Sequence, residues 1–252
     1  MFGMDPLYYL FSLPALLLSM LFSARVKSTF AKYSKVPAGC RMTGAEAAAA
    51  MLARSGIHDV RIKTVSGFLT DHYNPLDNTL NLSPDVYKGR SLAALGVACH
   101  EAGHAMQKAT AYPWMGLRTA LVPAANFGSK FAMIVFFAGL ALSGAATQVD
   151  PATGAAVGGG GGLGLMLVKA GIVLFGAAVA FSVVTLPVEW NASARAKKAL
   201  MECGILSPSE ERGASAVLNA AFMTYIAAAV SSISTLLYFL VRSGLLGGGR
   251  RR

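Results

Sequence analysis

Two histidines and a glutamate lie within five consecutive residues, in the order His100, Glu101, Ala, Gly, His104. Positions i and i+4 of an α-helix share one face, so both imidazoles can bind the same zinc ion. Glu101 then lies beside the metal without binding it, where a carboxylate accepts a proton from a zinc-activated water. The spacing therefore predicts a hydrolytic zinc site with His100 and His104 as ligands and Glu101 as general base.

The residues around this motif predict the helix that the site requires. Ser91 is a suitable N-cap, Lys108 suits the negative end of a helix, and the stretch between them contains no proline. Cys99 is rotated by about 100° from His100 on such a helix, so we expect a small buried side chain rather than a ligand. The alternative for the histidines is that both are buried in an ordinary helix without metal.

A catalytic zinc site needs a third protein ligand, and the nearby sequence does not supply it. A metzincin continuation would place glycine three residues after His104 and histidine six residues after it, whereas this chain has Gln107 and Thr110. The ligand must therefore be distant, and a glutamate on a later helix is a usual solution. The acids that follow the motif are Asp150, Glu189, Glu202, Glu210 and Glu211.

Glu189 is the strongest of these acids because it lies within an apolar run over residues 185–190, where an unpaired carboxylate is costly. Glu210 completes a capping box with Ser207, which Glu211 extends, and Glu202 is expected to be exposed at a helix end. Asp150 falls in a loop predicted on the other side of the membrane. The alternative for Glu189 is an ion pair with Arg195 or a lysine near the lipid headgroups.

Composition places this site in a membrane protein. Of 252 residues, 54% are hydrophobic and 13% are charged, and mean hydropathy is +0.52, whereas a soluble domain carries about 25% charged residues. Four uncharged runs are each long enough to cross a bilayer as a helix. They cover residues 6–24, 131–149, 170–188 and 221–241. The first has no basic residues before it and no convincing cleavage site after it, so we expect a retained anchor.

Basic residues near the predicted spans indicate their orientation. Lysines and arginines follow the first and third spans, whereas the loop over 147–162 has none, which predicts both termini outside and the histidine motif in the cytoplasm. The basic tail, with Arg242 and Arg250 to Arg252, opposes this topology. The net charge of +10 suits the anionic inner leaflet of a membrane better than nucleic acid, because no basic run alternates with aromatic residues. Three cysteines without CxxC spacing agree with a reducing compartment.

We expect a mainly α membrane protein with about four transmembrane helices and a small α+β, zincin-like cytoplasmic domain that carries the HExxH helix. The predicted division is an N-terminal transmembrane anchor (1–25), a soluble α+β region with that helix (26–118), two transmembrane helices joined by a glycine-rich loop (119–188), a third-ligand helix with a capped second helix (189–220), and a last transmembrane helix with the basic tail (221–252).

The soluble region is expected to contain a helix from Thr43 to Arg54 that begins with a capping box. Strands are predicted over 60–65, 68–73 and 79–82, with the turn formers of 74–78 making a hairpin loop. A strand before the zinc helix can lend its edge to an extended peptide. Asp71 and His72 at that loop could contact substrate, although ordinary turn and edge roles are favoured.

Several longer segments resemble the YugP-like neutral zinc metallopeptidases, a family of bacterial membrane proteins. The segments are DHYNP (71–75), NLSPDVY (81–87), LGVACHEAGHAMQ (95–107), TLPVEWNASARA (185–196) and TYIAAA (224–229). The family is similar in plan to the HtpX and CAAX prenyl proteases, which implies a gluzincin-like site with Glu189 as the third ligand. Those relatives have an aspartate four residues after the ligand, where this chain has Ser193, so Asn191, Ser193 and Arg195 are candidates for orienting the ligands.

The function expected from these observations is zinc-dependent hydrolysis of peptide bonds in membrane or membrane-associated proteins. Tyr225 or Arg118 could supply a further donor to the oxyanion, although Tyr225 is more readily explained by helix packing. Two alternatives remain open: an intramembrane site-2-type protease, and a zinc-stabilised membrane scaffold or chaperone without turnover. The apolar run before His100 is too short to cross a membrane and is flanked by basic residues, which argues against an intramembrane protease. A structural zinc site needs no unligated carboxylate, so Glu101 argues against a scaffold without turnover.

Overall fold

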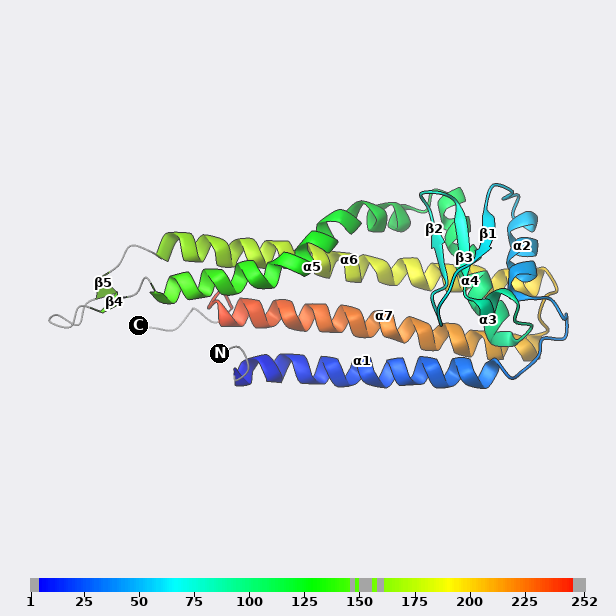
Figure 1. Ribbon diagram of the computed structural model, residues 1–252, viewed down its shortest axis with the longest axis horizontal. Coiled ribbons are helices and arrows are strands. Elements are labelled where there is room, and N and C mark those ends of the chain that lie inside the picture. The colour runs from blue at the N-terminus through cyan, green and yellow to red at the C-terminus, as the bar shows by residue number, and fades with distance from the viewer. Residues whose placement is uncertain (1–4, 146–147, 150–155, 158–160, 247–252) are drawn as a thin grey trace. The chain divides into compact units, whose positions relative to one another are not determined.

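The computed structural model describes residues 5–145, 148–149, 156–157 and 161–246, and most of them are helical (Figure 1). The chain divides into two compact units. We call the first the helical unit; it contains the described residues of 1–18, 118–183 and 228–252. The second, here the mixed unit, contains residues 19–117 and 184–227.

Four long helices contribute to the helical unit, namely α1 (Pro6–Tyr33), α5 (Pro113–Ala145), α6 (Gly161–Glu202) and α7 (Pro208–Arg242). Each is long and apolar enough to cross a membrane, so the number of candidate spans equals the number that the sequence predicted. The span predicted over 131–149 was wrong at its C-terminal end, because α5 (Pro113–Ala145) ends before residue 149. Gln148–Val149 (β4) instead pairs with Ala156–Val157 (β5). Asp150 and most of the glycine run lie outside the described residues.

Glycines allow α5 and α6 to approach closely within the helical unit. A Cβ added to Gly128 would lie 2.1 Å from the carbonyl oxygen of Leu174, and one added to Gly171 would lie 2.8 Å from the Cβ of Phe136. Small residues at helix crossings are a common way of packing helices in membranes. Phe136 also stacks on Phe239 of α7 with ring centroids 4.1 Å apart.

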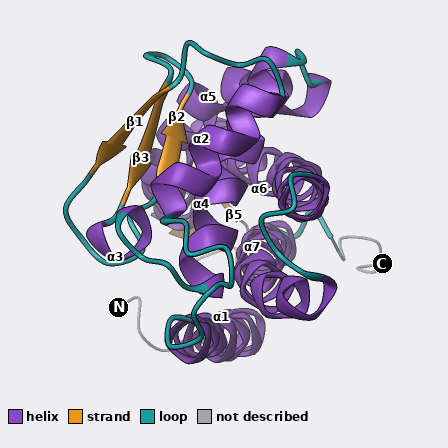
Figure 2. Cartoon of the chain, turned by 90° about the vertical axis from the view of Figure 1, so that its right-hand side faces the viewer, coloured by secondary structure: helices purple, strands orange, loops and turns teal. Residues whose placement is uncertain are grey.

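The mixed unit contains a three-stranded sheet in the order β1 (Arg61–Thr64), β3 (Thr79–Leu82), β2 (His72–Asn74). β2 and β3 form the predicted antiparallel hairpin, and β1 runs parallel to β3. Figure 2 shows these strands beside the helices of the unit. The strand predicted over 68–73 forms only from His72 onward, because Gly67 (φ +117°) and Leu69 (φ +55°) adopt left-handed backbone conformations that interrupt an extended strand.

The helices α2 (Gly44–Arg54), α3 (Pro84–Tyr87) and α4 (Leu92–Ala109) complete the mixed unit. The predicted capping box of α2 is confirmed, since Thr43 N donates to Glu46 and Glu46 N donates to Thr43 Oγ1. α4 begins after Ser91, whose hydroxyl accepts a hydrogen bond from Ala94 N as expected.

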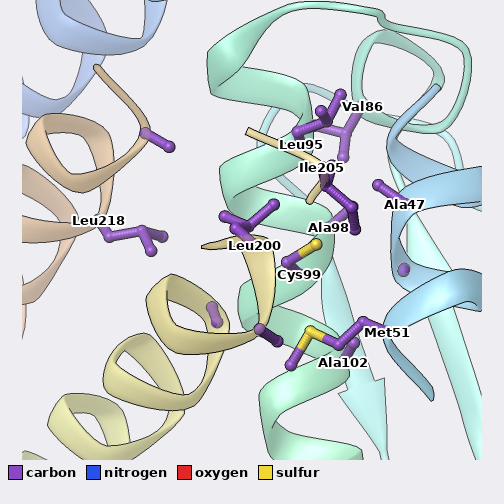
Figure 3. Packing of buried hydrophobic residues seen from close by; sticks show 14 of the residues in the cluster. Ala47, Met51, Val86, Leu95, Ala98, Cys99, Ala102, Leu200, Ile205 and Leu218 are labelled. Atoms are coloured by element: carbon purple, nitrogen blue, oxygen red, sulfur yellow. The ribbon is translucent and has the colours of Figure 1, made fainter. Parts of the chain in front are cut away.

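Apolar packing fixes α4 at the centre of the mixed unit. Its residues Ala98 and Ala102 are completely buried near Met51 of α2 and Leu200 of α6 (Figure 3). Cys99 is also completely buried in this core, as predicted. Burial raises the pKa of its thiol, which keeps the side chain neutral and poorly reactive. The helix that carries the histidine motif is therefore held on several sides.

The boundaries predicted at 188/189 and 220/221 fall inside continuous helices. α6 runs unbroken from Gly161 to Glu202 through Pro187, and α7 runs unbroken from Pro208 to Arg242. An alanine-rich sequence follows the apolar run of α6 and retains high helix propensity. As a result, Glu189 lies on the same helix as the preceding candidate span rather than on a separate one.

Candidate metal centre

The glycine of the histidine motif allows α6 to approach α4. A Cβ added to Gly103 would lie 2.6 Å from the carbonyl oxygen of Ala192, a separation that side chains do not tolerate. Only glycine at this position lets the two backbones come so close. The crossing places Glu189 of α6 opposite the face of α4 that carries His100 and His104.

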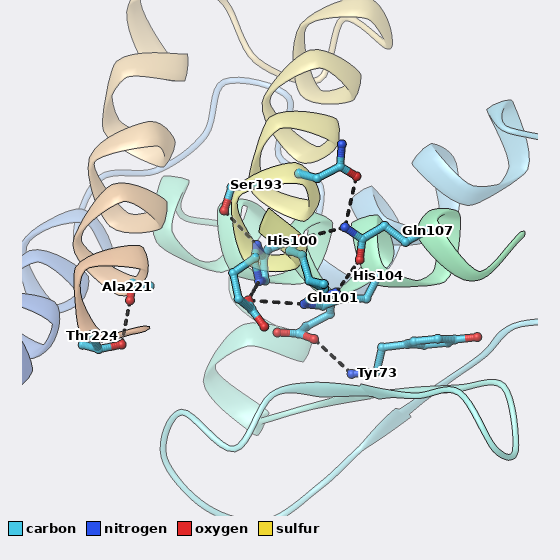
Figure 4. A network of polar contacts seen from close by, with 11 residues as sticks. Tyr73, His100, Glu101, His104, Gln107, Ser193, Ala221 and Thr224 are labelled. Carbon is cyan, nitrogen blue, oxygen red and sulfur yellow. Dashed lines mark hydrogen bonds and ion pairs between the residues drawn. The ribbon is translucent and has the colours of Figure 1, made fainter. Parts of the chain in front are cut away.

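Three potential ligand atoms meet at this crossing. Glu189 Oε2 lies 3.1 Å from His100 Nε2 and 3.5 Å from His104 Nε2, and Figure 4 shows the two histidines on α4. All three ligand atoms lie within 4.8 Å of one another, and within the described parts of the chain this is the one such group of histidine, cysteine or acidic residues. Glu189 is 1% exposed. The structure thus brings together the three residues that the sequence selected, and their binding of zinc stays a prediction.

A chain of hydrogen bonds determines which nitrogen of His104 faces the glutamate. Gln107 Nε2 donates to the carbonyl oxygen of Val188 at 2.7 Å and to Asn191 Oδ1 at 3.0 Å. The amide of Gln107 is therefore oriented so that its Oε1 must accept from His104 Nδ1, at 2.9 Å. With its proton on Nδ1, the neutral His104 ring presents a bare Nε2 lone pair to Glu189.

This arrangement of donors fits a zinc ion. A bare imidazole nitrogen and a carboxylate oxygen that face each other repel unless a proton or a metal ion lies between them, and two imidazoles with one carboxylate are a common ligand set of catalytic zinc. His100 Nδ1 lies 3.1 Å from Ser193 Oγ, so this ring is also held by its second nitrogen. Three protein ligands leave the fourth position of a tetrahedral site for water or substrate.

Glu101 lies outside the ligand group and contacts the sheet instead. Its Oε2 accepts a hydrogen bond of 3.0 Å from the backbone N–H of Tyr73 in β2. β2 is the edge strand on this side of the sheet, and the contact shows that the Tyr73 N–H points away from β3. The carboxylate expected to act as general base is therefore held against a strand edge.

Hydrogen bonds from Lys108 connect the turn of the β2–β3 hairpin to the C-terminal end of α4. Lys108 Nζ donates to the carbonyl oxygen of Pro75 and to Asn78 Oδ1. The Tyr73 hydroxyl donates to the same Asn78 oxygen at 3.0 Å. These bonds fix the position of β2 relative to the histidine helix, so that Tyr73 N–H can reach Glu101.

Asp71 and His72, at the start of the hairpin, have structural contacts. Asp71 accepts hydrogen bonds from the backbone N–H and the hydroxyl of Ser83. Burial raises the pKa of the Asp71 carboxyl, the bonds from Ser83 lower it, and the charge of Glu101 adds to the rise. His72 Nδ1 lies 2.8 Å from the carbonyl oxygen of Thr70. Both contacts are the turn and edge roles that the sequence favoured.

The other acids on α6 and α7 have partners away from the metal centre. Glu202 is exposed and lies 3.7 Å from Lys198. Glu210 accepts from the backbone N–H of Ser207 at 2.9 Å and from Gly39 N at 2.7 Å. The predicted capping box of α7 forms only in part, because the Ser207 hydroxyl donates to Glu210 instead of accepting from its N–H.

The candidates for orienting the ligands lie on α6, but only Ser193 contacts a histidine directly. Arg195 Nε donates to Asn191 Oδ1 at 2.8 Å, and Asn191 in turn accepts from Gln107. The proposed oxyanion donors Tyr225 and Arg118 stay predictions; Arg118 belongs to the helical unit, where its guanidinium lies over the ring of Phe181.

Sequence reasoning missed Gln107, which is completely buried and connects His104 to Asn191. The available signal was its spacing, because a residue three positions after a helical histidine lies on the same face.

We predict that Gln107→Leu weakens zinc binding by about 10- to 100-fold, the usual effect of removing a group that orients a metal-bound histidine. Zinc titration with a competing chelator measures this change, and unchanged affinity would contradict the role of Gln107.

Comparisons with known proteins identify the family of this chain. Residues 8–244 match the model of a family described as "Putative neutral zinc metallopeptidase". The chain is 41% identical over 235 residues to a Bacillus subtilis (strain 168) protein named "Putative membrane protease YugP", and the match covers 93% of this chain and 96% of that protein. No solved structure matches significantly.

Proposed function

The chain belongs to the putative neutral zinc metallopeptidase family, and we propose that it is a membrane-embedded zinc endopeptidase. The observation that carries this proposal is the convergence of His100, His104 and Glu189 beside an acid, Glu101, that is not part of the ligand group. A purely structural zinc site is closed by four protein ligands and needs no such acid. The convergence therefore favours turnover over a zinc-stabilised scaffold.

In this proposal, zinc bound by the three ligands supplies Lewis acidity, which activates a water and polarises the substrate carbonyl. Glu101 accepts the proton of that water and donates it to the leaving amide nitrogen. The Tyr73 N–H holds the Glu101 carboxylate in place. Ser193 and Gln107 hold the two histidine rings, so the donor atoms need little reorganisation during the reaction.

The substrate is proposed to bind as an extended segment along β2. This strand forms the sheet edge and lies against α4 at Glu101. Glu101 already occupies the outward-facing N–H of Tyr73, so an added peptide would pair with the remaining main-chain groups of this edge. Such pairing is sequence tolerant, because backbone groups provide most of the hydrogen bonds. We therefore expect specificity to come from access to the site rather than from one preferred side chain.

Membrane proteins are the proposed substrate class. Trp190 follows Glu189 directly, is 59% exposed and packs its ring against Phe222 of α7 at 5.3 Å. Exposed tryptophans next to an apolar run are typical of the level of the lipid headgroups. The histidine helix α4 is not among the four candidate spans, which favours cleavage at the membrane surface over a site-2-type reaction inside the bilayer.

The similarity to a Bacillus subtilis membrane protein supports a bacterial plasma-membrane protein, and the charge pattern supports a metal centre in the cytoplasm. We predict that, in a variant without native cysteines, Gly160→Cys reacts with an impermeant maleimide on intact cells. Lys198→Cys, whose native side chain is 73% exposed, should react only after permeabilisation. The reverse labelling pattern would place the metal centre outside the cell.

Removal of the metal tests the proposed activity. We expect the purified protein to cleave fragments of membrane proteins, to lose this activity with a zinc chelator, and to regain it when zinc is added back in slight excess over the chelator. Mass spectrometry of the products identifies the bonds that are broken. Cleavage that continues at full rate after zinc has been removed would contradict a zinc peptidase, and zinc binding without any cleavage would favour the scaffold.

A further inference from the structure

The helical unit contains a cavity of about 910 Å³ that is distinct from the metal centre. Helix α5 supplies most of its apolar wall, through Met133, Ile134, Phe137 and Leu140. Ile134 is 65% exposed and Met133 is 42% exposed, so this wall faces outward on a candidate membrane span. A cavity of this kind suits hydrocarbon.

One part of the cavity is lined by a polar cluster at the start of α1 and the end of α7. Asp5 Oδ2 accepts from the Tyr238 hydroxyl at 3.0 Å and lies 3.3 Å from Arg242 Nε. The ring of Tyr8 lies edge-on to that of Tyr238, with centroids 5.4 Å apart. Tyrosines and arginines at span ends are typical of the level of the lipid headgroups.

Lys130 lines the same cavity and lies within the candidate span of α5. Its side chain makes no hydrogen bond or ion pair with any residue that the structure describes. A lysine inside a span is costly unless it meets a counter-charge. The charged side chains that line the cavity are Asp5, Lys130 and Arg242, which carry one negative and two positive charges. Asp5 already pairs with Arg242, so an anionic ligand would balance the remaining positive charge.

We propose that this cavity binds an anionic phospholipid. An acyl chain lies along the apolar wall of α5, and the phosphate region accepts hydrogen bonds from Lys130 and Arg242. The excess positive charge distinguishes this site from an ordinary lipid-facing groove, which would accept any acyl chain. The cavity volume lies within the range of small-molecule sites in proteins, about 300–1,000 Å³.

Lipid binding to the delipidated full-length protein in detergent tests the proposal. Native mass spectrometry with phosphatidylglycerol and phosphatidylcholine should show tighter binding of the anionic lipid. A basic residue near a membrane surface contributes about 1 kcal/mol to binding of anionic lipid, so Lys130→Met should weaken phosphatidylglycerol binding about fivefold and leave phosphatidylcholine binding nearly unchanged.

Lys169→Met is the matched control, because Lys169 is an exposed lysine in the candidate span of α6 that does not line the cavity. It removes the same charge and should not change lipid binding. Equal affinity of the wild type for both lipids, or equal losses in the two variants, would overturn the proposal. Zinc content and melting temperature show whether each variant is folded, and Lys130→Gln provides a second neutral variant if Lys130→Met is not.

Discussion

Glu101→Gln is expected to lose peptide hydrolysis by about 100-fold or more while it retains zinc. General acid–base catalysis typically contributes 10²- to 10⁴-fold, and an amide cannot accept the proton that a carboxylate accepts. The amide oxygen of the variant can still accept from the Tyr73 N–H, so the contact between β2 and α4 should remain. Initial rates of peptide cleavage and zinc content at equal protein concentration measure the two effects separately.

Measuring cleavage rate and zinc content together separates a chemical role of Glu101 from a structural role. Glu46→Gln is a useful control, because Glu46 is an acid of the same mixed unit that caps α2 and is not part of the metal centre. That variant should lose some stability and no catalytic rate per folded molecule. Undiminished cleavage by Glu101→Gln would rule out the proposed general base, whereas joint loss of zinc and activity would mean that Glu101 helps to hold the metal.

The local part of the site was predictable because it depends only on helix geometry. His100 and His104 are one turn apart, and the structure places them on one face of α4 with ring centroids 4.9 Å apart. The selection of Glu189 needed a different argument, namely the cost of a carboxylate in an apolar run. The structure agrees with that argument, because the Glu189 side chain is buried (1% exposed) and its carboxylate lies beside both histidines.

The groups that orient the ligands could not be predicted with the same certainty, because they depend on how α4 and α6 cross. Gln107 reaches Val188 and Asn191 on the other helix, which the sequence does not bring together. The role of Gly103 was hidden for the same reason: its lack of a side chain matters only beside the Ala192 carbonyl. Spacing along one helix indicates which face a residue occupies, and it does not indicate which residue of another helix lies opposite.

The errors in the fold also have physical causes. The extent of the spans was inferred from uncharged runs, but helix formation continues through charged residues with high helix propensity, as in α6 beyond Glu189. The strand expected over 68–73 relied on side-chain pattern alone. Left-handed backbone at Leu69 is not signalled by its residue type, because leucine rarely adopts it.

Glu189→Ala is expected to strip zinc from the purified protein as completely as His104→Ala does. Two imidazoles alone leave the site with too few protein ligands for a stable zinc complex. The carboxylate of Glu189 is also the only group that contacts Nε2 of both histidines among the contacts that the structure describes. Zinc content after dialysis at equal protein concentration measures the loss, and circular dichroism shows whether the helices remain.

Two other glutamates serve as controls for this last experiment. Glu202→Ala removes an exposed acid of the same helix and should leave zinc content unchanged. Glu210→Ala removes the bonds to Ser207 and Gly39 and should reduce stability by about 0.5–2 kcal/mol, the usual effect of losing a helix cap, with zinc intact. Full zinc occupancy in Glu189→Ala would mean that another residue completes the site. Asp71 or His72, at the start of the β2–β3 hairpin, would be tested next.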